Sequence, residues 1–175
     1  AGSTRRGIAP VYADKMFRNG IRMIDLLEPI VFREKLEKGY AFAQGIIEKS
    51  LNQTLNISID DIFNTYSDYG HKLKPYIHDT SLELYRAHKS GKSILFEGAQ
   101  GISLDVDHGV YPFTTSSNTA AGHISTGTGV SFRDINRIIG VTKAYLSRVG
   151  ESPLPSEIHG NDAKSLRDKG GEYGT

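Results

Sequence analysis

The chain has 175 residues, of which 38% are hydrophobic, enough for one globular, soluble domain with its own core. Its 21 lysines and arginines nearly balance its 20 aspartates and glutamates, and the charges are spread out. The sequence therefore shows no cluster of basic residues of the kind typical of proteins that bind nucleic acid. No apolar run is long enough to span a membrane. The absence of cysteine excludes disulfides, thiolate catalysis and cysteine-bound zinc, and it favours a reducing compartment.

The first half of the chain, residues 29–90, is predicted to be mainly helical. Apolar residues recur at roughly helical spacing over residues 29–51, and the proline at the start of this stretch suits a first helical turn. Ser58 begins a pattern that resembles a capping box, which predicts a helix over residues 58–70. A further helix is expected over residues 75–89, with Gly91 as the signal that stops it.

The pattern changes near residue 93. Residues 93–96 (SILF) form a short apolar run that is too short for a helix and predicts a buried strand. Residues 134–139 are expected to form one or two helical turns, and residues 141–149 (VTKAYLSRV) to form a second strand. A short helix is predicted over residues 161–169. The whole pattern indicates an α/β domain that carries a helical insertion.

Six uncharged polar residues, residues 114–119, follow one another within GVYPFTTSSNTAAG. Serine, threonine and asparagine are ordinary loop formers, so this run by itself predicts only a loop. Beside glycines that let backbone N–H groups approach a ligand, the same residues could hold an anion. We expect residues 100–119 at one end of the predicted sheet, where α/β proteins bind their ligands.

Two short glycine motifs do not meet the requirements of nucleotide-binding loops. In SGKS, residues 90–93, Arg86 stands where a Walker motif needs glycine, and the lysine precedes the predicted strand instead of following one. GTG, residues 127–129, lacks the spacing of a dinucleotide fingerprint and is interpreted as a turn. The six histidines show no metal-ligand spacing.

A cluster of acidic residues lies in DVDHG, residues 105–109. On a strand, Asp105 and Asp107 would share a face, where they could bind a cation or could instead pair with lysines and cap turns. His108 adds an imidazole to these carboxylates, but because the sequence shows no partner residues for the cluster, we prefer the second interpretation.

Three long stretches carry a resemblance to a known family. They are STRRGIAPVYADKMFRNG (residues 3–20), ILFEGAQGISLDVDHGVYPFTTSSNTAAG (residues 94–122) and TKAYLSRVGESPLPSE (residues 142–157). In this order they resemble the middle of the adenylosuccinate synthetases, and the resemblance covers residues 3–175. It implies an α/β fold with a helical insertion. The chain would be one segment of a P-loop-NTPase-like ligase and would contribute to its mostly parallel sheet. Residues 29–90 would be its mainly helical subdomain, and residues 93–175 its strands and IMP-binding loops.

The family resembled here joins IMP and L-aspartate in purine (AMP) biosynthesis. It hydrolyses GTP in the presence of Mg²⁺ and gives adenylosuccinate, GDP and phosphate. The resemblance therefore implies a cytoplasmic ligase that acts as a homodimer and has no nucleic-acid or membrane partner. In such phosphoryl transfers, positioning and charge neutralisation supply most of the rate.

The resemblance also implies roles for individual residues. Thr4 and Thr115 match positions that contact the phosphate of IMP, and Gln100 matches an amide that contacts IMP. Val149 matches a position that lines the same site. Arg18 matches an arginine that reaches into the active site of the other subunit. No catalytic residue and no magnesium ligand is implied within this segment.

The GTP loop and the catalytic groups of the family would precede residue 1, and the segments that recognise aspartate and guanine would follow residue 175. We therefore expect this chain to be a piece of a longer protein that carries much of the IMP site and is inactive by itself. The alternatives left open are a non-catalytic nucleotide-binding module and a dimerisation fragment built on Arg18 and the helical region. All three hypotheses predict the same core.

Overall fold

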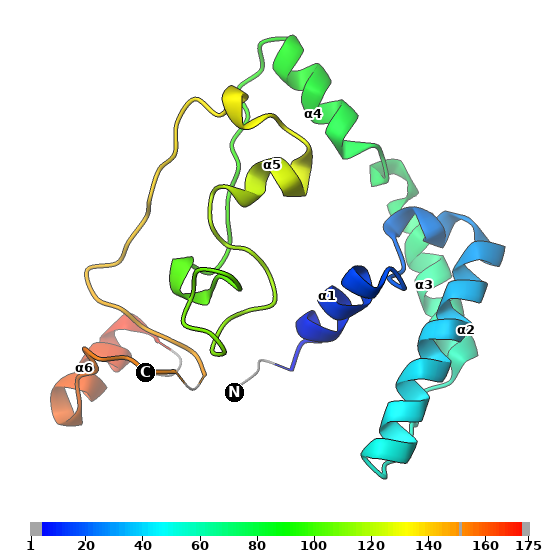
Figure 1. Ribbon diagram of the computed structural model, residues 1–175, viewed down its shortest axis with the longest axis horizontal. Helices are drawn as coiled ribbons and strands as arrows, with labels where there is room; N and C mark the ends of the chain where they lie inside the picture. The colour runs from blue at the N-terminus through cyan, green and yellow to red at the C-terminus, as the bar shows by residue number, and fades with distance from the viewer. Residues whose placement is uncertain (1–4, 151, 173–175) are drawn as a thin grey trace. The chain divides into compact units, whose positions relative to one another are not determined.

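A computed structural model describes residues 5–150 and 152–172 (Figure 1). The chain divides into two compact units. One consists of residues 10–83, and the other consists of residues 84–175 together with residues 1–9, as far as these are described. In the described part of the chain no helix has the length and hydropathy needed to cross a membrane.

The unit of residues 10–83 is helical. Its elements in chain order are α1 (Ile8–Phe17), of which the first two residues belong to the other unit, the 3₁₀-helix η1 (Met23–Leu27), α2 (Pro29–Gly45), the π-helical turn η2 (Ile46–Ser50), α3 (Ile59–Leu73) and the 3₁₀-helix η3 (Lys74–Tyr76). Helices α2 and α3 lie side by side, and η1 packs against both (Figure 1).

The core of this unit is small and aromatic. Phe32 of α2 is only 2% exposed, and its ring stacks on that of Phe63 in α3 with a centroid distance of 5.2 Å. Leu26 and Leu36 complete the buried cluster, and Ile59 of α3 packs against it. The helical spacing of the apolar residues in the sequence thus becomes the contact between α2 and α3.

The helices expected over residues 29–51 and 58–70 are confirmed, with small changes at their ends. The Ser58 hydroxyl caps α3 by accepting hydrogen bonds from the backbone N–H groups of Asp60 (3.1 Å) and Asp61 (3.5 Å). Helix α3 continues past Gly70. This glycine allows close packing instead of ending the helix, since a Cβ atom there would lie 2.8 Å from the Leu26 carbonyl oxygen.

The helix expected over residues 75–89 begins later than predicted. Residues 74–76 form η3, and Ile77 then adopts an extended backbone conformation, so α4 comprises only Thr80–Lys89. Gly91 follows α4 with a φ of +72°, a conformation that favours glycine and suits the end of a helix. SGKS therefore belongs to the turn that ends α4, where the Ser90 hydroxyl donates to the Ala87 carbonyl.

The second unit has short helices joined by long irregular segments (Figure 1). After α4 these are the 3₁₀-helix η4 (Ile102–Leu104), α5 (His123–Thr128), the 3₁₀-helix η5 (Phe132–Asp134) and α6 (Gly160–Gly170). Helix α6 confirms the prediction over residues 161–169, with one more residue at each end. The GTG motif ends α5, and Gly129 caps that helix with a φ of +80°.

The predicted strands are wrong for this structure. No strand is assigned in residues 5–150 or 152–172, so residues 93–96 and 141–149 are irregular and the mostly parallel sheet is not supported. A strand requires a hydrogen-bonded neighbour, whereas an apolar run indicates only which residues favour burial. Leu95 and Val141 lack that burial, since they are 87% and 93% exposed. The loop of residues 100–119 consequently has no sheet edge beside it.

The helical turns expected over residues 134–139 are also wrong. Only Asp134 belongs to η5, and Ile135 already has an extended conformation with φ −88° and ψ 103°. The Ser131 hydroxyl caps η5 by accepting from the N–H of Arg133 at 3.2 Å. The short helix therefore lies a few residues earlier in the chain than the apolar pattern of the sequence predicted.

Candidate functional site

The polar run lies in a loop that is built around a buried carboxylate. Asp105 has no solvent exposure. Its Oδ1 atom accepts hydrogen bonds from the backbone N–H groups of Asp107 (2.9 Å) and His108 (3.0 Å). Its Oδ2 atom accepts from those of Thr119 (2.5 Å) and Ala120 (3.0 Å). The turn-capping interpretation of DVDHG is thus confirmed for Asp105.

These contacts control the protonation of the carboxyl group. Burial raises the pKa of Asp105, but the four backbone N–H donors stabilise the charged form more strongly and hold the pKa well below its usual range. Asp105 is therefore an anion throughout the neutral pH range.

Backbone hydrogen bonds hold the two sides of the loop together around this carboxylate. The N–H of Thr115 donates to the Leu104 carbonyl at 2.8 Å, and the N–H of Val106 donates to the Ser117 carbonyl at 3.2 Å. At Gly109 a side chain would place its Cβ 2.4 Å from the carbonyl oxygen of Asp105, so the turn requires glycine. The loop is therefore closely packed, although it has no regular secondary structure beyond η4.

The polar side chains of residues 114–119 divide into two groups. The Asn118 amide donates to Asp107 Oδ2 at 2.5 Å, and the Thr119 hydroxyl donates to the Gly101 carbonyl at 2.8 Å. In contrast, the hydroxyls of residues 114–117 make no hydrogen bond with any other described residue. These four residues are half-buried, so their hydroxyls are available to a ligand.

Arg148 connects a distant segment of the chain to this loop. Its guanidinium donates from Nη2 to the Phe113 carbonyl and from Nη1 to the Ser103 hydroxyl (3.3 Å). Val149 follows Arg148 directly, and Thr115 lies two residues after Phe113. Arg148 thus joins the segments that contain two of the predicted site residues, Val149 and Thr115.

Gln100 lies at the start of the same loop. It is exposed and has a φ of +64°, which is uncommon for a residue with a side chain. The next residue, Gly101, provides the carbonyl that binds the Thr119 hydroxyl. The structure therefore places Gln100 at the base of the loop that contains Thr115.

Of the two remaining predicted site residues, the structure describes Arg18 alone. Arg18 follows α1 in the unit of residues 10–83, where it is exposed and its N–H donates to the Lys15 carbonyl at 3.1 Å. Its φ is +65°. Thr4 lies outside the described residues.

Sequence reasoning missed two residues that organise this region. Arg148 lies within the SRVG motif, but no local pattern indicates that its partners are 35 and 45 residues away. The burial of Asp105 was also missed, since an acidic residue in a glycine-rich segment is usually exposed. The available signal was the short distance in sequence between DVDHG and the polar run. This spacing does not by itself predict the contact of Asp105 with residues 119 and 120, because that contact forms when the chain folds.

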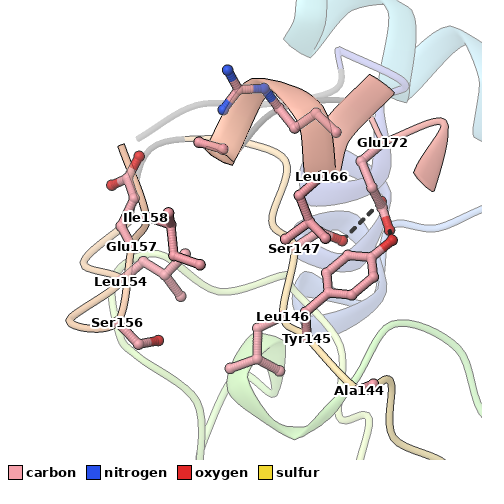
Figure 2. Close-up of a pocket in the computed structure, with 12 residues that line it drawn as sticks. Ala144, Tyr145, Leu146, Ser147, Leu154, Ser156, Glu157, Ile158, Leu166 and Glu172 are labelled. Atoms are coloured by element: carbon pink, nitrogen blue, oxygen red, sulfur yellow. Dashed lines mark hydrogen bonds between the residues drawn. The ribbon is translucent and has the colours of Figure 1, made fainter. Parts of the chain in front are cut away.

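A separate cavity of about 310 Å³ lies in the second unit (Figure 2). Residues 144–147, 154 and 156–158 line it together with parts of α6 and Glu172. The Glu172 carboxylate accepts hydrogen bonds from Lys143 (2.5 Å), Ser147 (2.8 Å) and Tyr145 (3.0 Å). Of the predicted site residues that the structure describes, none lines this cavity, so the loop around Asp105 stays the candidate site.

Hydrogen bonding within this cluster shifts two pKa values. The bonds from Lys143 and Ser147 lower the pKa of Glu172, and the bond to Glu172 raises the pKa of Tyr145. Figure 2 shows Tyr145, Ser147 and Glu172 pointing toward one another at one side of the cavity. The cluster therefore attaches the irregular segment of residues 143–147 to the end of α6.

The chain also matches known proteins. The sequence model of the adenylosuccinate synthetase family matches residues 1–175. An adenylosuccinate synthetase from Geobacter metallireducens is 51% identical over 173 residues, and one from Bacillus anthracis is 48% identical over 174 residues. Each alignment covers 99% of this chain and 40% of the relative. The chain thus spans about 40% of the length of these curated relatives.

A solved structure agrees with these sequence matches. The fully ligated adenylosuccinate synthetase from Plasmodium falciparum has a TM-score of 0.89 and 33% sequence identity to this chain, and the match covers 99% of this chain and 40% of that one. Together with the family match over its whole length, these findings show that the chain belongs to the adenylosuccinate synthetase family.

Proposed function

We propose that this chain is a central segment of an enzyme that joins IMP and L-aspartate with hydrolysis of GTP. The products would be adenylosuccinate, GDP and phosphate, and the enzyme would be a cytoplasmic ligase of purine (AMP) biosynthesis. The observation that carries the proposal is the family match across residues 1–175. Within the segment, residues 29–90 would form the helical part and residues 93–175 would contain the IMP-binding loops.

The proposed role of this segment is to hold IMP. A dianionic phosphate needs several short donors at hydrogen-bond distance, and neutral hydroxyls can converge on it without repelling one another as clustered cations would. The unpaired hydroxyls of residues 114–117 support this role, with Thr115 as the contact implied by the family. Thr4, Gln100 and Val149 complete the proposed site within one chain.

We also propose that the enzyme is a homodimer in which Arg18 reaches the IMP phosphate of the other subunit. The exposure of Arg18 supports this role, since the side chain is free to enter a second chain. A guanidinium would add to the neutral donors the positive charge that the phosphate requires.

The chemistry proposed for the complete enzyme begins with transfer of the terminal phosphoryl group of GTP to O6 of IMP. The aspartate amine then displaces phosphate, which is a better leaving group than hydroxide. The part of this chain would be to fix the purine nucleotide so that its O6 faces GTP, because positioning supplies much of the rate in such transfers.

Magnesium would complete the proposed reaction, but the residues described here do not fit a magnesium site. No group of three or more histidine, aspartate or glutamate residues that could hold a metal ion occurs among them. The oxygens of Asp105 already accept backbone N–H groups, and one oxygen of Asp107 accepts the Asn118 amide. We therefore assign the magnesium ligands to other parts of the enzyme and derive no step through the ion.

The test is a substrate-omission assay on the full-length enzyme that contains this segment. We expect adenylosuccinate and GDP to form in equal amounts from GTP, IMP, aspartate and Mg²⁺, as measured by chromatography with mass detection. Omission of IMP or aspartate should abolish adenylosuccinate. If the complete set of substrates yields GDP without adenylosuccinate, the proposed ligase activity is wrong.

A further inference from the structure

The two sides of the polar loop meet at one buried charge. One side comprises residues 102–109, and the other comprises residues 113–120. Asp105 bonds to both sides, since Oδ1 accepts from residues 107 and 108 and Oδ2 accepts from residues 119 and 120. The carboxylate therefore connects the two sides of the loop through hydrogen bonds.

A buried charge in this position imposes strict requirements on its surroundings. An ion without solvent exposure is costly unless hydrogen bonds replace its hydration. Here backbone N–H donors and the Asn118 amide, at 3.5 Å, are the contacts described for Asp105. Any slip of residues 119–120 along the other side would remove donors from the charge, so the carboxylate favours one register of the loop.

That register decides where the unpaired hydroxyls lie. Residues 114–117 are separated by Asn118 alone from the two residues that bind Oδ2, and the bond from the Thr115 N–H to the Leu104 carbonyl depends on the same register. The Thr119 hydroxyl binds the Gly101 carbonyl at 2.8 Å and reinforces it. Asn118 and Thr119 thus use their polar side chains to hold the loop, and the hydroxyls of residues 114–117 are left for a ligand.

We propose that Asp105 is a positioning residue for phosphate recognition. Its carboxylate fixes residues 113–120 against residues 102–109, and so directs the hydroxyls of residues 114–117 toward the phosphate of IMP. Asp105 itself is buried and acts through the loop, without touching the nucleotide. This inference rests on the proposed IMP-binding function.

The experiment compares Asp105→Asn with wild type in the full-length enzyme. Asparagine has almost the same shape, but its amide nitrogen would face two backbone N–H donors in place of an acceptor oxygen. Asp68→Asn is the matched control, because Asp68 is an exposed residue of α3 outside the site. Calorimetric titration gives the dissociation constants of IMP and of inosine, which lacks the phosphate.

We expect Asp105→Asn to weaken IMP binding about tenfold or more while the affinity for inosine changes little. The ratio of the two dissociation constants isolates the phosphate contact, whereas a general loss of folding would lower the affinity for both ligands. Asp68→Asn should keep the wild-type ratio. Faster hydrogen exchange at the N–H groups of residues 119 and 120 in Asp105→Asn would support the same mechanism.

A folded Asp105→Asn variant with the wild-type ratio of IMP to inosine affinity would overturn the inference. If that variant does not fold, Asn118→Ala takes its place, since it removes the amide bonds to Asp105 and Asp107 without introducing a donor into the loop. We expect Asn118→Ala to decrease the ratio of IMP affinity to inosine affinity, by less than Asp105→Asn would. An unchanged ratio would again overturn the inference. A wild-type enzyme that does not prefer IMP to inosine would instead contradict the proposed function.

Discussion

At the scale of single residues, the polar loop shows how similar side chains take different roles. Thr119 uses its hydroxyl to bind the Gly101 carbonyl, whereas the hydroxyl of Thr115 has no partner among the residues that the structure describes. Thr115 is held by its backbone, through the 2.8 Å bond from its N–H to the Leu104 carbonyl. A change at its hydroxyl should therefore affect a ligand more than it affects the fold.

Substitution of Thr115 by valine tests this separation in the full-length enzyme. Thr115→Val keeps the shape and removes one phosphate donor, so we expect IMP binding to weaken by about 1 to 3 kcal/mol with little loss of stability. Thr119→Val is the comparison for stability: because its hydroxyl holds the loop at the Gly101 carbonyl, it should lower the free energy of unfolding by about 1 kcal/mol, which Thr115→Val should not do. Calorimetric titration and urea unfolding measure the two effects, and unchanged IMP affinity in Thr115→Val would remove its hydroxyl from the phosphate site.

At the scale of elements, an ion pair ties η1 to α2. Lys35 Nζ lies 2.6 Å from Asp25 Oδ2, and the same oxygen accepts from the backbone N–H of Arg22 at 2.6 Å. Burial raises the pKa of Asp25, but the bonds from Lys35 and Arg22 outweigh it and the pKa lies below its ordinary value. The charged carboxylate therefore stabilises the folded state.

The pH dependence of Asp25→Asn should reveal this contribution. Because the pKa is lower in the folded than in the unfolded state, the stabilisation is complete above the unfolded value of 3.8 and disappears as pH falls through the folded value. We expect Asp25→Asn to unfold more easily by about 1 to 3 kcal/mol at pH 7, and the difference from wild type to shrink below pH 3.8. Urea unfolding between pH 7 and pH 3 measures it.

Lys35→Met provides the comparison for this prediction. A double-mutant cycle of Asp25→Asn and Lys35→Met should give a coupling free energy at pH 7 that decreases in acid. A stability difference that is the same at every pH would show that the charge of Asp25 does not contribute.

At the scale of the whole molecule, the chain has a small core and long irregular segments. Among the described residues, Leu26, Phe32 and Leu36 form a buried apolar cluster, whereas Leu95 and Val141 are almost fully exposed. The chain nevertheless matches a solved relative with a TM-score of 0.89. We interpret residues 93–96 and 141–149 as segments whose apolar side chains need partners from the remaining length of the enzyme.

The same reasoning predicts that the isolated 175-residue chain forms no adenylosuccinate. Holding reactants in the correct geometry supplies about 7 to 11 kcal/mol of the barrier reduction, and this advantage is lost when GTP and aspartate have no site. The purified chain is incubated with GTP, IMP, aspartate and Mg²⁺ beside the full-length enzyme, and the products are separated by mass-resolved chromatography. Product above the blank, traced to the short chain, would place the catalytic groups within it.

A subunit-mixing experiment tests the proposed role of Arg18. An Arg18→Leu subunit is combined with one that carries substitutions at both Gln100 and Thr115. If Arg18 acts across the dimer interface, one active site of the heterodimer combines an intact IMP loop with an intact arginine, so partial activity should return. Absence of activity in verified heterodimers would mean that Arg18 acts within its own chain.

Much of the helical unit could be predicted from the sequence, because the signals are local. The cap at Ser58 and the apolar spacing of α2 depend on residues within one or two turns, and both predictions are confirmed. In the candidate site, the loop character of residues 114–119 was equally local. The strands were predicted wrongly because pairing depends on a neighbour that an apolar run does not specify.

By itself, therefore, the sequence determined the helices over residues 29–45 and 59–73, and its long motifs determined the family. Only the tertiary structure decided which polar residues hold the loop and which are left for a ligand. Asp105 binds N–H groups 14 and 15 residues away, and Arg148 binds a carbonyl 35 residues away. Such contacts satisfy buried charges and donors, and their partners become defined only when distant segments of the chain pack together.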